Sequence, residues 1–173
     1  MLKINLNELR KYKVFVFYQE GYEYFYETGE YDQDFSYFCG FIENIYTKQG
    51  EIIFKVYGLG IRNKLKHAEF KIHMKDIEIY ISDFKKTYNI YPGIKGYEYM
   101  NIETSFKYDF DNSRYHGHTK YRLFKNLDFR FIMRRFYELV PPTFICEIES
   151  AMLTDPQIRK IVNIPEDYEF ATY

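Results

Sequence analysis

The spacing of the hydrophobic residues changes once along this chain, near residue 126, and this change constrains the fold more than any motif does. Before it, apolar and polar residues alternate, as in residues 70–75 (FKIHMK). A period of two is typical of β-strands. After it, apolar residues recur at helical spacing, as in residues 129–140 (FRFIMRRFYELV). The pattern predicts an α+β fold: an antiparallel β-sheet or small SH3-like barrel over about residues 12–125, followed by a helical C-terminal third.

Turn-forming residues divide the β-rich part. We expect Glu20-Gly21 to turn the chain after a first strand, and Thr47-Lys48-Gln49-Gly50 to close a long hairpin over residues 36–60. Segments rich in Gly, acids or other polar residues predict loops at 28–34, 61–67 and 111–119. The remaining strands are expected at 14–19, 22–26, 70–75, 77–81, 97–110 and 120–125.

The C-terminal part is expected to be helical. Apolar spacing predicts helices over 126–140 and 143–153, separated by Pro141-Pro142. Thr154-Asp155-Pro156-Gln157 is typical of a further helix start, because a side-chain acceptor precedes a proline in the first turn. A short helix is also expected within residues 1–11. We expect one domain over residues 1–173, with a β-rich part (12–125), a helical part (126–163) and an acidic extended tail (164–173).

The composition is unusual in its aromatic residues, which make up 21% of the chain as 20 Tyr and 17 Phe with no Trp. Tyr suits half-buried sheet faces and contact surfaces, because its ring is apolar and its hydroxyl needs water or a partner. The net charge of −1 conceals charge segregation: acids gather within residues 20–51 and 138–173, and bases between them. A balanced total argues against general coating of nucleic acid, while separated charges steer association with a partner.

The segment EGYEYFYETGEYDQDF (residues 20–35) alternates aromatic rings with acids and contains no base. Our preferred hypothesis is a non-enzymatic interaction protein that binds a partner protein with a basic surface. Inhibitors fit this class, such as toxin-immunity proteins or anti-defence proteins of phages and mobile elements. The alternative left open is that these acids pair with the chain's own bases at 62–75 or 130–135. The predicted partner-binding residues are Tyr22, Glu23, Glu27, Glu30, Tyr31, Asp32 and Asp34.

A second hypothesis is a nucleic-acid-binding module. Bases near residues 62–75, accompanied by Tyr57 and Phe70, offer positive charge for phosphates and rings for stacking. The residues predicted for this role are Arg62, Lys64, Lys66, Lys71, Lys75, Arg130 and Arg134.

A third hypothesis is a metal-dependent hydrolase around Asp109, Asp111, His116 and His118, because imidazole and carboxylate groups bind divalent metals and activate water. The preferred interpretation of this segment is a polar loop with two solvent-facing histidines, and we expect neither a metal nor a cofactor. No serine or cysteine lies in a nucleophile motif.

The compartment is predicted from what the sequence lacks. The two cysteines, Cys39 and Cys146, have no metal-ligand spacing and are expected to be reduced thiols. The first residues lack the apolar run of a signal peptide, and no stretch approaches 18 apolar residues. We therefore expect a cytoplasmic protein that does not enter a membrane.

Overall fold

The computed structural model describes residues 6–60, 64–73, 81–87, 97–125, 127–128, 130, 132–134, 136 and 142–162, and all structural statements below concern these residues.

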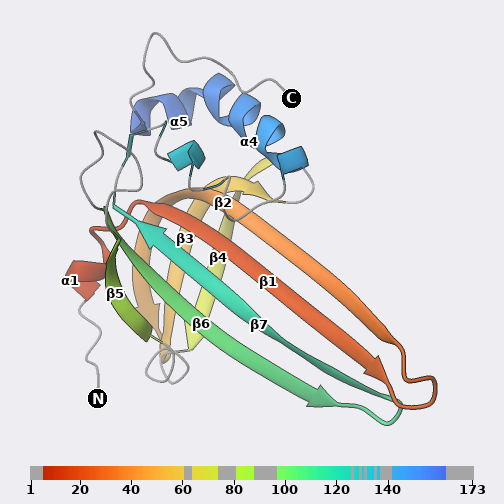
Figure 1. Ribbon diagram of the computed structural model, residues 1–173. Helices are drawn as coiled ribbons and strands as arrows, with labels where there is room; N and C mark the ends of the chain where they lie inside the picture. Colours follow the sequence, from red (N-terminus) through yellow and green to blue (C-terminus); the bar gives the residue numbers. More distant parts are fainter. Residues whose placement is uncertain are drawn as a thin grey trace.

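Most of the described chain forms one seven-stranded antiparallel sheet, with the strand order β4-β3-β2-β1-β7-β6-β5 (Figure 1). The prediction of an antiparallel sheet with helices late in the chain is confirmed. The SH3-like barrel is not confirmed, because the sheet is not closed. The strands are β1 (Val14–Phe25), β2 (Tyr31–Lys48), β3 (Glu51–Gly60), β4 (Leu65–His73), β5 (Ile81–Thr87), β6 (Tyr97–Asp109) and β7 (Ser113–Phe124).

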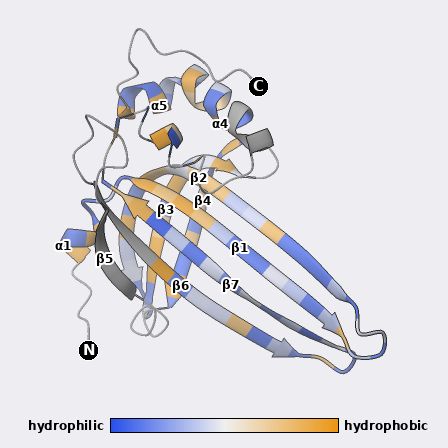
Figure 2. Cartoon of the chain, in the orientation of Figure 1, coloured by the Kyte–Doolittle hydropathy of each residue, from blue (hydrophilic) through white to orange (hydrophobic). Residues whose placement is uncertain are grey.

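Alternating side chains of the sheet form a hydrophobic cluster on each face. Val14 and Val16 of β1 pack on one face with the helices α4 (Pro142–Thr154) and α5 (Pro156–Ile161). Phe15 of β1 packs on the other face, in a cluster that includes Leu9 of α1 (Leu6–Leu9). Because successive strand residues point to opposite faces, one strand supplies both clusters. Figure 2 shows the apolar residues concentrated at this end of the sheet and in the helices above it.

The sheet curls strongly within its second cluster. Phe70 of β4 and Tyr121 of β7 have ring centroids 6.5 Å apart, although β3, β2 and β1 lie between their strands. Phe70 also contacts Phe15, with centroids 4.8 Å apart. Contacts across three intervening strands require that β4 bends back over the face of the sheet. The curled part encloses apolar rings in the way that a barrel interior does, while its two edges stay apart.

Two pairs of glycines face each other across neighbouring strands: Gly40 of β2 with Gly58 of β3, and Gly21 of β1 with Gly117 of β7. A methyl group on Gly58 would overlap the Cys39 carbonyl oxygen and the Gly40 Cα. A methyl group on Gly117 would overlap the Glu20 carbonyl oxygen. Because glycine has no side chain, the paired strands approach each other at these positions more closely than any other residue would allow. This close approach permits the strands to bend and coil locally.

The predicted hairpin over residues 36–60 is confirmed, with its turn at Gln49-Gly50. Both residues have positive φ, 51° and 77°, and Lys48 pairs directly with Glu51. A two-residue connection with positive φ at both positions matches the right-handed twist of the flanking strands.

Four predicted connections are wrong in part or in whole. Gly21 lies within β1, where it allows close approach of β7 rather than a turn. The loops predicted at 28–34 and 111–119 are mostly strand, because β2 begins at Tyr31 and β7 at Ser113. β4 likewise begins within the basic loop predicted at 61–67. These segments are polar on both faces, so they lack the apolar alternation by which strands are recognised.

The helical predictions are confirmed where the structure describes them. α4 corresponds to the helix predicted over 143–153. Of the helix predicted over 126–140, the described residues 130, 132–134 and 136 are helical. Asp155 caps α5, since its side chain accepts a 2.9 Å hydrogen bond from the amide of Ile158. Within residues 1–11, where a short helix is expected, the structure describes α1. The strand expected at 77–81 lies mostly, and the tail 164–173 wholly, outside the described residues.

Two further expectations concern Cys39 and membrane spans. The thiol of Cys39 is free and buried, and burial raises its pKa. None of the helices in the described ranges has both the length and the apolar character needed to cross a bilayer.

The close contact at Gly58 predicts a large stability difference between two neighbouring substitutions. Gly58→Ala places a methyl group against backbone, which cannot move without disturbing the ladder, and should lower the free energy of unfolding by about 2 to 3 kcal/mol. A methyl group on Gly60 would meet the Phe38 ring at 3.4 Å and the Tyr37 carbonyl oxygen at 3.5 Å, both near ordinary van der Waals contact, so Gly60→Ala should cost less than about 1 kcal/mol. Urea unfolding followed by circular dichroism measures both. Equal losses would contradict the role assigned to the glycine pair.

Candidate protein-binding arm

Four strands extend beyond the body of the sheet as an arm (Figure 1). β3 pairs with β2 only from Phe38 onward, and β5 pairs with β6 only as far as Ile102. Past these points, residues 18–36 of the β1–β2 hairpin and residues 103–120 of the β6–β7 hairpin continue as a four-stranded sheet. We call these two segments the arm. Neither hydrophobic cluster contains an arm residue.

The arm carries the exposed rings of the molecule. Among the described residues, all the large hydrophobic side chains that are exposed lie on it, with exposed fractions between 42% and 64%. Since burial of apolar surface drives folding, rings left in solvent on a polar arm do not contribute to the core. They are Tyr26, Tyr31, Phe35, Tyr108 and Phe110.

One face of the arm continues the face that α4 and α5 cover, and we call it the tyrosine face. The rings of Tyr24 and Tyr31 lie 4.9 Å apart between centroids, and those of Tyr18 and Phe35 lie 6.2 Å apart. Beside these rings, β7 places a row of basic and imidazole side chains on the same face. The row consists of Arg114, His116, His118 and Lys120.

Glu20 is the polar centre of the tyrosine face. The hydroxyls of Tyr22 and Tyr18 donate hydrogen bonds to its carboxylate over 2.7 and 3.1 Å, and His118 Nε2 contacts the other oxygen. Partial burial opposes ionisation of Glu20, but these hydrogen bonds and the charges of His118 and Lys120 outweigh it. The pKa of Glu20 is therefore lowered. The same contact with Glu20 raises the pKa of Tyr22.

The opposite face, which we call the acidic face, combines carboxylates with rings. Across the strands in one row lie Asp32, Glu23, Tyr115 and Tyr108, and Asp34 lies two residues from Asp32 on the same face. None of the described residues of this face is Lys, Arg or His. The ring of Phe106 lies 5.3 Å from that of Tyr115 and 6.2 Å from that of Tyr108 between centroids.

Asp32 and Glu23 are direct cross-strand neighbours, an arrangement that works against folding. Ser113 donates a 2.9 Å hydrogen bond to Glu23, which offsets only part of the repulsion. Two carboxylates lie opposite each other on a face that has no base among its described residues. They create a negative potential that no base on that face compensates.

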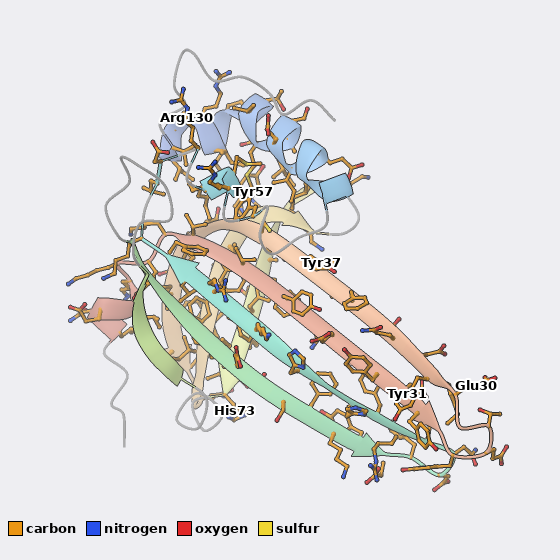
Figure 3. All side chains as sticks on the ribbon, viewed as in Figure 1. Glu30, Tyr31, Tyr37, Tyr57, His73 and Arg130 are labelled. Carbon is orange, nitrogen blue, oxygen red and sulfur yellow. The ribbon has the colours of Figure 1, made fainter. Side chains whose placement is uncertain are left out.

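Asp109 lies at the tip of the arm, where the two hairpins meet. Tyr26 and Arg114 each donate a 3.0 Å hydrogen bond to Asp109 Oδ1, and the bond from Tyr26 connects the β1–β2 hairpin with the β6–β7 hairpin. These bonds lower the pKa of Asp109. Glu27 and Glu30 are exposed in the turn of the β1–β2 hairpin. Figure 3 shows Glu30 and Tyr31 at the far end of the arm.

The structure therefore brings the predicted partner-binding residues together on the arm, but divides them between its faces. Tyr22 and Tyr31 lie on the tyrosine face, whereas Glu23, Asp32 and Asp34 lie on the acidic face. Glu30 and Arg130 lie at opposite ends of the molecule in Figure 3, so these two residues do not pair.

Those residues predicted to bind nucleic acid that the structure describes do not all share one surface. Lys66 faces the curled interior and lines a pocket of about 460 Å³ with Phe17, Phe38 and Phe70. Lys71 points to the opposite side of β4. Acidic side chains lie among the bases near Lys71: Glu69 forms an ion pair with Lys55, and Glu43 contacts His67. Arg130 lies by the helices, away from the His73 end of β4 (Figure 3), and Arg134 is in a helical segment. Arg62 and Lys75 lie outside the described residues.

The predicted polar loop around His116 and His118 is a strand. Both imidazoles lie on the tyrosine face, where His118 contacts Glu20 and the ring of His116 stacks on Tyr22 with centroids 5.6 Å apart. Asp109 is held by Arg114 and not by either histidine. In the described part of the chain, no group of three or more His, Cys, Asp or Glu residues is arranged to hold a metal ion.

Sequence reasoning missed the aromatic half of the acidic face. Phe106, Tyr108 and Phe110 alternate in a segment predicted as strand, and this period was the available signal. The sequence pattern does not reveal the pairing register of β1 with β7, which places Tyr115 beside Glu23.

Comparison with protein-family models, with curated protein sequences and with solved structures finds no match.

The network at Glu20 predicts a pH-dependent effect of Glu20→Gln. The lowered pKa means that ionised Glu20 stabilises the fold above its unfolded-state pKa of 4.5, and that this contribution is lost as pH falls through the lower folded-state pKa. At pH 7 the variant should lose on the order of 1 kcal/mol, given the partial exposure of the site. Near pH 3 its difference from the wild type should be small. Urea unfolding at both pH values, with Glu147→Gln as an exposed control, measures this, and an unchanged loss at pH 3 would refute it.

Proposed function

We propose that this protein is a non-enzymatic interaction protein and that its arm binds a partner protein through the acidic face. The observation that carries the proposal is the composition of that face: carboxylates and rings without a base, on an arm that supplies no residue to either hydrophobic cluster. Aromatic residues are enriched at protein interfaces, and a patch of one charge attracts a patch of the opposite charge. The matching partner surface is basic, with apolar gaps for the rings.

The shape of the arm favours a grooved partner. A four-stranded sheet with side chains on two faces and acids at its tip fits into a cleft better than onto a flat surface. Basic clefts commonly serve nucleic acids, whose backbones are also negative. A protein that fills such a cleft acts as an inhibitor.

We assign the protein on this basis to the inhibitor or immunity class. It acts in the cytoplasm as an anti-defence protein of a phage or mobile element, or as the immunity partner of a toxin. The abundance of Lys, Ile, Tyr and Phe is typical of proteins from AT-rich genomes and agrees with such a source.

Nucleic acid is the second candidate ligand, and the basic row of the tyrosine face is the observation that favours it. Arg114 and Lys120 border tyrosine rings on an open sheet, which is the combination used to stack bases and neutralise phosphates. Glu20 and Asp109 on the same face reduce its positive potential. Salt-dependent binding of a single-stranded oligonucleotide, lost in Arg114→Glu, would favour this candidate over the acidic face.

Charge reversal on the acidic face tests the proposal. A partner recovered by affinity capture from the source cells is purified, and its dissociation constant is measured by calorimetry with the wild type and with Asp32→Lys/Asp34→Lys. The double variant should bind at least tenfold more weakly, because two attractive contacts become repulsive. Its melting temperature should not fall, since replacing Asp32 removes the repulsion with Glu23.

The matched control is Glu8→Lys/Glu147→Lys, which changes the net charge equally at sites away from the arm. It should bind like the wild type. Equal weakening in both double variants would mean that net charge alone steers binding. An unchanged affinity in Asp32→Lys/Asp34→Lys would overturn the proposal.

A further inference from the structure

Within the arm, the outer edge of β2 is unpaired as far as the structure describes the chain. β1 pairs with β2 from Val14↔Phe41 to Tyr24↔Tyr31, whereas β3 pairs with β2 only from Phe38 onward. Over residues 31–36 no described strand lies on the other side of β2. An edge of this kind presents backbone donors and acceptors to any chain that can lie beside it.

The backbone groups that face outward follow from the register. The amide of Phe25 donates to the carbonyl of Glu30, and that of Ile42 donates to the carbonyl of Lys13, so these pairs are hydrogen-bonded. Hydrogen-bonded and non-hydrogen-bonded pairs alternate along an antiparallel ladder. Asp32 and Asp34 therefore bond inward to β1. Tyr31, Gln33 and Phe35 direct their N–H and C=O groups outward, to the unpaired edge.

The side chains along this edge sort by face. Tyr31, Gln33 and Phe35 lie on the tyrosine face and are uncharged, with Tyr31 64% and Phe35 42% exposed. Asp32 and Asp34 lie on the acidic face and are exposed as well. A strand added beside β2 would thus meet rings on one of its faces and carboxylates on the other.

The outer edge of β6 differs from that of β2. The amide of Phe110 donates to the carbonyl of Ser113, so by the same alternation the backbones of Glu103, Ser105, Lys107 and Asp109 face outward past Ile102. Three of these four residues are charged, and charges on an edge deter strand addition. On β2 the residues whose backbones face outward, Tyr31, Gln33 and Phe35, are uncharged, and the charges of that edge lie on the acidic face alone.

We propose that the outer edge of β2 binds its partner by β-strand addition, and that the partner contributes an extended segment in which basic and apolar residues alternate. This inference rests on the proposed function and names its contact. Basic residues face Asp32 and Asp34, apolar ones cover Tyr31 and Phe35, and the backbones share a ladder. A second copy of this chain is a poor occupant, because pairing centred on Gln33 would set Asp32 of one copy opposite Asp34 of the other.

The test uses a defined probe, the heptapeptide acetyl-Val-Lys-Val-Lys-Val-Lys-Val-amide carrying a fluorophore, whose anisotropy is followed on titration with the full chain. In the added strand, the valine amides point to β2 and the lysine amides point away. N-methylation of two valines should therefore weaken binding at least tenfold, whereas N-methylation of two lysines should leave it unchanged. The two methylated peptides have the same composition and charge.

Gln33→Pro is the corresponding variant of the protein, since it removes an outward amide that the native ladder does not use. It should abolish peptide binding. Gln33→Ala, which also loses the 3.0 Å hydrogen bond from Gln33 to the Tyr22 hydroxyl, should retain it. If Gln33→Pro fails to fold, the binding of the two methylated peptides to the wild type still shows whether the peptide is added as a strand.

The outcomes separate this inference from the proposed function. Equal binding of the two methylated peptides, lost in Asp32→Lys/Asp34→Lys, would overturn strand addition and leave the acidic face as the binding surface. No binding of the parent peptide up to about 1 mM would also overturn strand addition. A tenfold difference between the methylated peptides, with protection of the Tyr31, Gln33 and Phe35 amides from hydrogen exchange, would establish it.

Discussion

Close backbone contact at the glycine pairs sets the shape on which the rest of the molecule depends. Gly40 with Gly58 lies where β2 leaves the arm and pairs with β3 in the curled body, and Gly21 with Gly117 lies within the arm itself. A side chain at these positions would push neighbouring strands apart on the face toward which the sheet bends. Without this curl, Phe70 would not reach Tyr121, and the second hydrophobic cluster would be open to water.

The consequence is a division between a body that holds the fold and an arm that meets solvent on both faces. Apolar burial is concentrated in the body, where one cluster lies under α4 and α5 and the other within the curl. The arm is held by backbone ladders and by polar contacts such as those at Glu20 and Asp109. Because its rings and acids are not needed for burial, their arrangement is open to selection for binding.

Sequence patterns predicted the parts of the fold that are governed by local chemistry. The turn at Gln49-Gly50 and the cap at Asp155 follow from residue type alone. The arm was harder, because residues 113–120 of β7 are mostly polar and Gly21 resembles a turn. Most of all, the pairing of β1 with β7 joins residues about a hundred positions apart. The acids of the candidate site were therefore visible in the sequence, but their aromatic neighbours Phe106, Tyr108 and Tyr115 were not.

The central claim is that the arm, and not the basic surface of β4 or the helices, contacts the partner. Hydrogen-exchange mass spectrometry of the intact chain, alone and saturated with its purified partner, tests this claim most directly. We expect protection on binding to be confined to peptides within residues 18–36 and 103–120, and to be strongest at 31–36. Protection at 64–73 or 130–134, with none in the arm, would contradict it.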